Sequence, residues 1–246
     1  MHCAIVPTAL LSGTGLVALG EAESHHLRDV LRARPGDAVR LVDGRGSARE
    51  AAVAAVTRRE VSVELRGGVL TPPPPAARVT LFQCVAKPAR MDWLLEKAAE
   101  LGAARIVPIL SARTVARLRP GETPERWRRI LDAALCQCNA AWGTELEPAV
   151  DWAGALERMR ALGGPLFVGS LAPGALPMGE ALLARRDALR AGPVGWLVGP
   201  EGDFAPDELA SALALPGAVP VTLGNRVLRV ETAAVFGLSS LLSLAL

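Results

Sequence analysis

Two segments near the carboxyl end each place a glycine-bearing turn between a short apolar run and a stretch with helical character. The first apolar run covers residues 193–198 and is followed by Gly-Pro-Glu-Gly at residues 199–202. The second covers residues 220–223 and is followed by Gly224, with a helical pattern over residues 231–244. Uninterrupted apolar runs are typical of strands that are buried on both faces of a parallel sheet. The chain is therefore predicted to form an α/β fold with a parallel sheet.

A sheet of this kind has a preferred place for a ligand. In an open parallel sheet, the loops after the carboxyl ends of the strands form the usual ligand crevice. Glycine in such a loop lets the backbone approach a ligand closely, although an isolated glycine usually serves only the turn itself. Because both turns follow buried strands, Gly199, Gly202 and Gly224 are interpreted as ligand-contacting residues.

The middle of the chain continues the α/β plan. Strands are predicted at residues 78–83, 105–110 and 166–169, and helices at residues 91–101 and 123–140. Gly102 is expected to end the first of these helices, and Thr123 to cap the second with Pro124 in its first turn. A further helix is predicted to begin at Pro206.

Four consecutive prolines mark a domain boundary. The four prolines at residues 72–75 have no backbone N–H group to donate, and they favour an extended path of the chain. Before them, short apolar runs at residues 38–42, 51–56 and 61–65 are separated by polar turn residues, which is typical of a small β domain. We therefore expect one domain at residues 1–72 and a second at residues 73–246.

The two turns, with the sequence around them, closely resemble the ribosomal small-subunit RNA methyltransferase E family, the uridine N3-methyltransferases of the SPOUT class. The matched pattern is Gly-Pro-Glu-Gly, at residues 199–202, followed by Leu-Gly-x-x-Val-Leu-Arg-x-Glu-Thr-Ala at residues 223–233. Further matches lie at residues 90–94, 96–98, 100–102, 106–108, 30–32 and 35–37, and at His26.

The resemblance implies a fold and an activity. It implies a PUA-like β-barrel RNA-binding domain, followed by a SPOUT-type parallel sheet with a carboxyl-terminal trefoil knot. It also implies S-adenosylmethionine as methyl donor, N3 of a uridine in 16S ribosomal RNA of the small subunit as acceptor, a homodimer, and a cytoplasmic location. Periodicity alone predicts an ordinary doubly wound sheet, so the knot is expected from the resemblance only.

The resemblance also implies which residues bind the donor, mainly through backbone groups of the knot loops. These residues are Leu171, Val198, Gly199, Pro200, Glu201, Gly202, Leu223, Gly224, Val227, Leu228 and Arg229. Asp203 stands where the family usually has glycine. Its carboxylate would either attract the positive charge of the donor or help to cap the following helix, and we favour the capping role.

Two side chains of the second turn are candidates for catalysis. Arg229 is expected to stabilise negative charge that develops on the uracil carbonyl oxygens. The alternative role of this side chain is structural, in a salt bridge to Glu231 or Asp203. Glu231 would accept the N3 proton, directly or through water, if its pKa were raised. A carboxylate in the first turn of a helix also stabilises the helix dipole, so Glu231 keeps a structural alternative.

Basic residues are candidates for contacts with RNA phosphates. The net charge is only +2, but residues 76–145 carry 11 basic and 7 acidic groups. Arg90 and Lys97 share a helix face, and Arg129 lies on the next predicted helix. His26 and Arg32 lie in the segment that resembles the RNA-contacting part of the barrel. For each of these residues a solvated surface charge is the alternative.

Departures from the family pattern leave other functions open. Cys3 and residues 140–142 stand where the family carries arginines. The alternatives are a methyltransferase that acts on another RNA base or a ribose, and a non-catalytic RNA-binding assembly protein. The four cysteines lack the spacing of a zinc site, and no run of about 18 apolar residues suggests a membrane span. Neither a metal nor a membrane is therefore expected.

Overall fold

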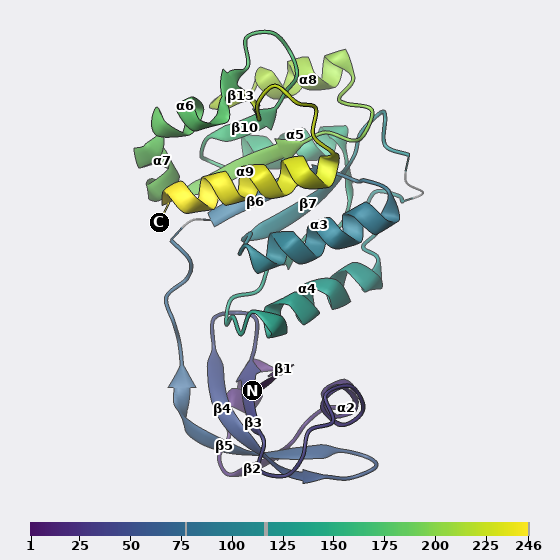
Figure 1. Ribbon diagram of the computed structural model, residues 1–246, viewed down its shortest axis with the longest axis vertical. Coiled ribbons are helices and arrows are strands. Elements are labelled where there is room, and N and C mark those ends of the chain that lie inside the picture. The colour runs from purple at the N-terminus through teal and green to yellow at the C-terminus, as the bar shows by residue number, and fades with distance from the viewer. Residues whose placement is uncertain (77, 116–117, 246) are drawn as a thin grey trace. The chain divides into compact units, whose positions relative to one another are not determined.

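The computed structural model describes residues 1–76, 78–115 and 118–245, and the chain divides into two compact units (Figure 1). The first unit comprises Met1–Pro74 and Asp132–Gly143, and the second comprises Pro75–Leu131 and Thr144–Leu246. Residues 132–143 belong to the first unit because Leu135 and Ala141 pack with Cys3, Val42 and Ala48 in one apolar cluster. The sequence does not indicate that residues 132–143 pack with the first unit, because this packing depends on contacts between distant segments.

The first unit is built on a five-stranded sheet. Its strands are β1 (His2–Ile5), β2 (Leu16–Ala18), β3 (Ala38–Val42), β4 (Ala48–Val56) and β5 (Val61–Leu70), in the order β1-β3-β4-β5-β2. β1 runs parallel to β3, and the other neighbours are antiparallel. The short helices are α1 (Thr8–Leu11), α2 (Glu21–His25) and the π-helical turn η1 (His26–Val30). The three predicted strands are confirmed as β3, β4 and β5.

The second unit is built on an eight-stranded sheet in which every neighbouring pair is parallel. Its strands are β6 (Arg78–Cys84), β7 (Arg105–Leu110), β8 (Glu145–Leu146), β9 (Val150–Asp151), β10 (Leu166–Gly169), β11 (Leu176–Pro177), β12 (Pro193–Val198) and β13 (Ala218–Thr222). The order is β11-β13-β10-β12-β6-β7-β8, and β9 also pairs with β7. The predicted parallel α/β sheet is therefore confirmed.

Helices cover both faces of this sheet (Figure 1). They are α3 (Pro88–Glu100), α4 (Glu125–Gln137), α5 (Trp152–Arg160), α6 (Met178–Leu183), α7 (Arg186–Ala191), α8 (Pro206–Leu213) and α9 (Val230–Ala245). Residues of α3, α6, α7 and α9 share one apolar cluster, and residues of α5 and α8 share another. β12 contributes Trp196 to the first cluster and Leu197 to the second, which explains why its sequence is apolar at successive positions.

Strand order determines where the two turns lie. β10 lies between β12 and β13 and is parallel to both. The carboxyl ends of these three strands therefore meet at one edge of the sheet. The loops that follow β12 and β13 are the two glycine-bearing turns, and they lie on either side of the loop that follows β10.

Among the helices of the described ranges, none is long and apolar enough to cross a lipid bilayer.

Candidate ligand site at the carboxyl edge of the parallel sheet

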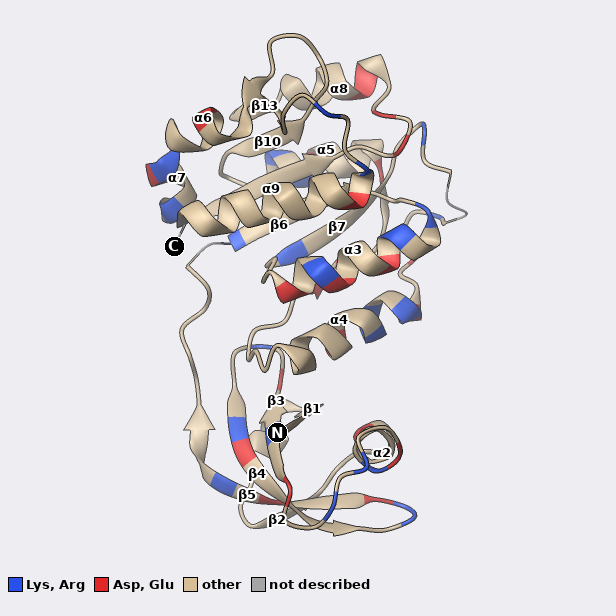
Figure 2. Ribbon diagram, viewed as in Figure 1, with Lys and Arg blue, Asp and Glu red and all other residues tan. Residues whose placement is uncertain are grey.

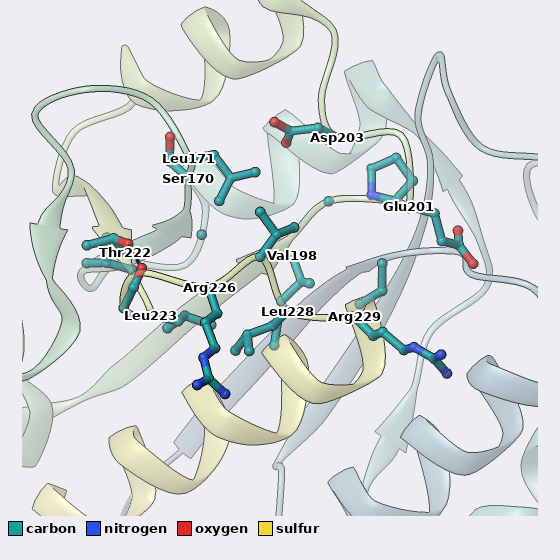
Figure 3. A pocket seen from close by; sticks show the side chains of 18 of the residues that line it. Ser170, Leu171, Val198, Glu201, Asp203, Thr222, Leu223, Arg226, Leu228 and Arg229 are labelled. Atoms are coloured by element: carbon teal, nitrogen blue, oxygen red, sulfur yellow. Dashed lines mark hydrogen bonds between the residues drawn. The ribbon is translucent and has the colours of Figure 1, made fainter.

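One cavity of about 330 Å³ lies at this edge of the sheet (Figure 3). Its walls come from the loops after β10, β12 and β13, from the first turns of α9, and from α3 through Arg90. A cavity of this size falls in the lower range of small-molecule sites in proteins. The two turns, which are separated by more than twenty residues of sequence, thus border a single space.

The cavity is lined by every residue predicted to bind the donor except Gly202. Gly202 instead presents its carbonyl oxygen to Arg113, whose Nη1 donates to it at 2.8 Å. The lining also includes residues that were not predicted to bind the donor: Gly169, Ser170, Trp196, Val221, Thr222, Arg226, Val230 and Ala233. All of these lie within or directly beside a predicted strand or the matched pattern at residues 223–233, and this position in the sequence was the signal that could have found them.

The inner part of the cavity is apolar and closely packed. Trp196 is fully buried, and the structure gives its Nε1 no hydrogen-bond partner among the described residues. Two glycines lie against its ring, since a Cβ atom at Gly169 would approach Cη2 to 3.1 Å and one at Gly237 would approach Cε2 to 2.2 Å. The absence of side chains at these two positions therefore creates the space that the indole ring occupies.

Gly224 provides a conformation that other residues rarely adopt. Its φ angle is +116°, in the region that favours glycine, and an added Cβ would meet no atom within 4 Å. Thr222 Oγ1 donates to the carbonyl oxygen of Gly224 at 3.1 Å. Glycine is thus needed here for the backbone path of the second turn.

Asp203 adopts the left-handed conformation, with a φ angle of +61°. A left-handed backbone explains why the resembled family usually has glycine at this position. Asp tolerates the left-handed region better than most residues do. Asp203 does not cap α8 as we favoured: its Oδ1 accepts from the backbone N of Phe204 at 2.8 Å, and the residue lines the cavity. The buried side chain of Glu208 caps the helix instead, because its Oε2 accepts from the backbone N of Ala205 at 3.0 Å.

A compact charge cluster joins the two turns at one side of the cavity. Nη1 of Arg90 lies 3.2 Å from Oε1 of Glu201, and its Nε lies 3.9 Å from Oε1 of Glu231. The backbone N of Lys87 also donates to Oε1 of Glu201, at 3.2 Å. Oε2 of Glu231 is buried and has no hydrogen-bond partner among the described residues. Glu231 is not among the residues that line the cavity, and this oxygen is enclosed by protein next to the lining residue Val230.

Arg226 and Arg229 are exposed cations of the cavity rim. In the described part of the chain neither side chain forms an ion pair, so the alternative salt bridge from Arg229 to Glu231 or Asp203 is absent. Figure 3 shows both guanidinium groups extending away from the carboxylate of Asp203. Two positive groups are therefore free to meet an approaching anion or carbonyl oxygen.

The residues predicted to contact RNA are distributed over both units. His26 and Arg32 are exposed in the first unit, and Arg32 has a φ angle of +53°. Lys97 donates to Glu96 at 2.7 Å and to Glu100 at 2.6 Å, which partly neutralises its charge.

Basic residues also lie on α3 and α4 (Figure 2). Arg129 pairs with Glu125 at 2.6 Å, yet its side chain is 71% exposed. Of the predicted RNA contacts, only Arg90 lines the cavity. No group of three or more His, Cys, Asp or Glu side chains in the described ranges could hold a metal ion.

Both halves of the chain match known families. Residues 72–242 match a family described as RNA methyltransferase domain, and residues 19–66 match one described as RNA methyltransferase PUA domain. The chain is 34% identical to ribosomal RNA small subunit methyltransferase E of Mycobacterium bovis, over 94% of this chain and 87% of the relative. It is 28% identical to the protein of the same name from Synechocystis, over 96% of this chain and 75% of the relative.

A solved structure shares the fold over almost the whole chain. It is the ribosomal RNA small subunit methyltransferase E of Neisseria gonorrhoeae bound to S-adenosyl methionine. The two structures agree with a TM-score of 0.86 at 28% sequence identity, and the match covers 99% of this chain and 98% of the other.

Proposed function

The chain belongs to the ribosomal RNA small subunit methyltransferase E family, and on this basis we propose that it transfers the methyl group of S-adenosylmethionine to N3 of a uridine in 16S ribosomal RNA. One observation carries the proposal: both family turns line one cavity, in a fold shared with a relative that is bound to this donor. The proposed setting is the small ribosomal subunit in the cytoplasm.

The residues of the cavity fit the donor. Backbone groups at Gly199 and Gly224 are accessible because these residues carry no side chain. Leu171, Leu223 and Leu228 offer apolar surface for a nucleoside base, and the carboxylate of Asp203 offers negative charge for a cation. When bound, S-adenosylmethionine supplies a methyl group activated by a positively charged sulfur atom.

The chain itself has two tasks in this reaction. The N3 proton must leave the uridine before N3 can accept the methyl group, and the negative charge on the uracil ring must be stabilised. We assign the first task to Glu231, which follows the lining residue Val230 at the start of α9 and would accept the proton directly or through water. We assign the second to Arg229, an exposed guanidinium without an ion pair among the described residues.

Recognition of the RNA is assigned to both predicted domains. Residues 1–72 are proposed as the RNA-binding domain, with His26 and Arg32 as exposed contacts. Arg129 is proposed as a phosphate contact of the methyltransferase domain at residues 73–246, and so is Lys97, which would first have to leave Glu96 and Glu100. Arginine and lysine side chains in such positions fix the register of an RNA without reading its sequence.

A homodimer is proposed from the apolar groups that remain exposed near the cavity. Val227 is 79% exposed, Leu171 is 62% exposed and Phe236 is 45% exposed. Large apolar side chains with this exposure are candidate contacts of a protein interface where they gather into one patch. A second copy of the chain would cover them, and this arrangement would let the partner complete the site. The trefoil knot implied by the family resemblance stays a prediction.

The experiment is to incubate the protein with S-adenosylmethionine labelled in its methyl group and 30S subunits that lack the modification, and then to identify the labelled nucleoside. The expected product is N3-methyluridine, at one nucleotide of 16S RNA. Subunits that already carry the modification serve as the control and should take up no label. A different nucleoside would favour another RNA target, and donor binding without any product would favour a non-catalytic assembly protein.

A further inference from the structure

One arginine connects three parts of the donor cavity. Arg90 lies in the first turn of α3, whereas Glu201 belongs to the loop after β12 and Glu231 to the start of α9. The guanidinium lies 3.2 Å from the first carboxylate and 3.9 Å from the second. Each glycine-bearing turn thus places one carboxylate beside the same guanidinium. A movement of either turn would disturb its contact with Arg90.

The environment of these charges makes the contact more than a solvated surface pair. The Arg90 side chain is 32% exposed, that of Glu201 is 22% exposed and that of Glu231 is 14% exposed. Solvent weakens exposed ion pairs strongly, and partly buried pairs are screened much less. A second donor, the backbone N of Lys87, ties Glu201 to the segment just before α3. The loop after β12 is therefore attached to α3 at two points.

The charge of the cluster argues against a phosphate contact. One guanidinium faces two carboxylates, so the three side chains together carry a net negative charge when all are ionised. An RNA phosphate would be repelled by these carboxylates and would have to displace them from the arginine. Arg229 and Arg226, which lack ion pairs among the described residues, present their positive charge without this competition.

We propose that Arg90 is a positioning residue for methyl transfer, and that it holds the two donor loops in register by bridging Glu201 and Glu231. This inference rests on the proposed function. The same ion pair fixes Oε1 of Glu231 beside Arg90, whereas Oε2 is buried without a hydrogen-bond partner among the described residues. Arg90 donates a hydrogen bond to Glu201, whereas its contact with Glu231 is an ion pair without a hydrogen bond. A planar guanidinium can face two carboxylates from fixed directions, whereas a lysine ammonium is a single point charge on a flexible stem.

The test compares Arg90→Met and Arg90→Lys with the wild-type protein. A matched control is Arg105→Met, because Arg105 also lies between two carboxylates, at 3.0 Å from Glu145 and 3.4 Å from Glu147, but at the amino end of β7. Hydrogen exchange in the donor-free protein should become faster at residues 199–204 and 223–229 in Arg90→Met, and should be unchanged there in Arg105→Met. Unchanged exchange in both loops of Arg90→Met would overturn the proposal.

Kinetics distinguish positioning from RNA binding. In Arg90→Met we expect donor affinity to fall by about tenfold and kcat to fall further, while KM for 30S subunits stays within about twofold of the wild type. Arg90→Lys should keep the charge without restoring kcat. A raised KM for 30S subunits with unchanged kcat and donor affinity would assign Arg90 to the RNA instead.

A second variant protects the test against poor folding of Arg90→Met. Glu201→Gln removes the charge of one bridged group but keeps its shape, and the losses of kcat in Glu201→Gln and Arg90→Lys should be less than additive in the double variant. Additive losses would contradict a shared bridge. If the wild-type protein bound no donor, the proposed function would fail, whereas the exchange measurement would still decide the role of Arg90.

Discussion

A methyl group added at Gly237 should destabilise the second unit and distort the donor cavity. Gly237 lies within α9, and a Cβ atom there would come within 2.2 Å of Cε2 and 2.5 Å of Nε1 of Trp196. Carbon atoms in contact are normally about 3.5–4.0 Å apart. Trp196 is fully buried and Gly169 lies against its ring as well, so the ring can move only towards the cavity that it lines.

Two effects of opposite sign compete in Gly237→Ala. Helix propensity alone would stabilise the protein by about 1 kcal/mol, since alanine is the better helix former. Overpacking of a filled core costs about 1–3 kcal/mol, and the very short contact with a fully buried ring places this substitution at the upper end of that range. We therefore expect a net loss of about 2 kcal/mol, which lowers the Tm by roughly 4–8 °C for a unit of this size.

The assay is thermal unfolding followed by circular dichroism, together with calorimetric titration of the donor. Gly179→Ala is the control, because Gly179 lies in α6 and an added Cβ would meet no atom within 4 Å. Its Tm should not decrease. Donor affinity should fall only in Gly237→Ala, since a displaced Trp196 would enter the cavity that it lines. A Tm for Gly237→Ala equal to or above that of the wild type would refute the packing argument.

Three further predictions concern catalysis, association and thiol reactivity. Arg229→Ala should lower kcat by roughly a hundredfold while donor affinity changes little, and equal losses in both quantities would contradict the assigned role. Phe236→Asp should halve the mass seen in sedimentation and lower activity, so a fully active monomer would count against the dimer. Iodoacetamide at pH 8 should modify exposed Cys138 before Cys84. Burial raises the pKa of the Cys84 thiol, which keeps it protonated and unreactive until the protein unfolds, and mass spectrometry of the labelled peptides would reveal any early reaction.

Several elements of the second unit could be predicted from local sequence. The strand predicted at residues 105–110 coincides with β7, and α8 begins at Pro206 as expected. Gly102, with a φ angle of +84°, follows the end of α3. α4 ends at Gln137 rather than at residue 140, because Asn139 adopts a φ angle of +51° that a helix does not accommodate.

The sequence did not predict elements whose formation depends on pairing with a distant segment of the chain. β1 was not predicted, and among the described residues it pairs only with β3, in parallel from His2↔Val39 onwards. A four-residue strand carries little periodicity of its own, so its existence depends on a partner some forty residues away. The same reason explains why the sequence did not indicate that residues 132–143 belong to the first unit.

The sequence by itself determined the parallel α/β plan, the two glycine-bearing turns and the residues that resemble the family pattern. These features are local, because an apolar run, a left-handed turn or a helix start depends mainly on its own residues and their immediate neighbours. The predicted donor residues lie in these local segments, and most of them line the cavity.

Only the tertiary structure decided what the charged side chains of the site contact. Strand order places β10 between β12 and β13, and this arrangement brings the loops after these strands to one cavity. Arg90 and Glu201 are separated by 111 residues, and Arg90 was expected to contact RNA because the sequence could not reveal the carboxylates beside it. Coulomb interactions depend on distance in space and on burial, and neither quantity can be read from the order of residues along the chain.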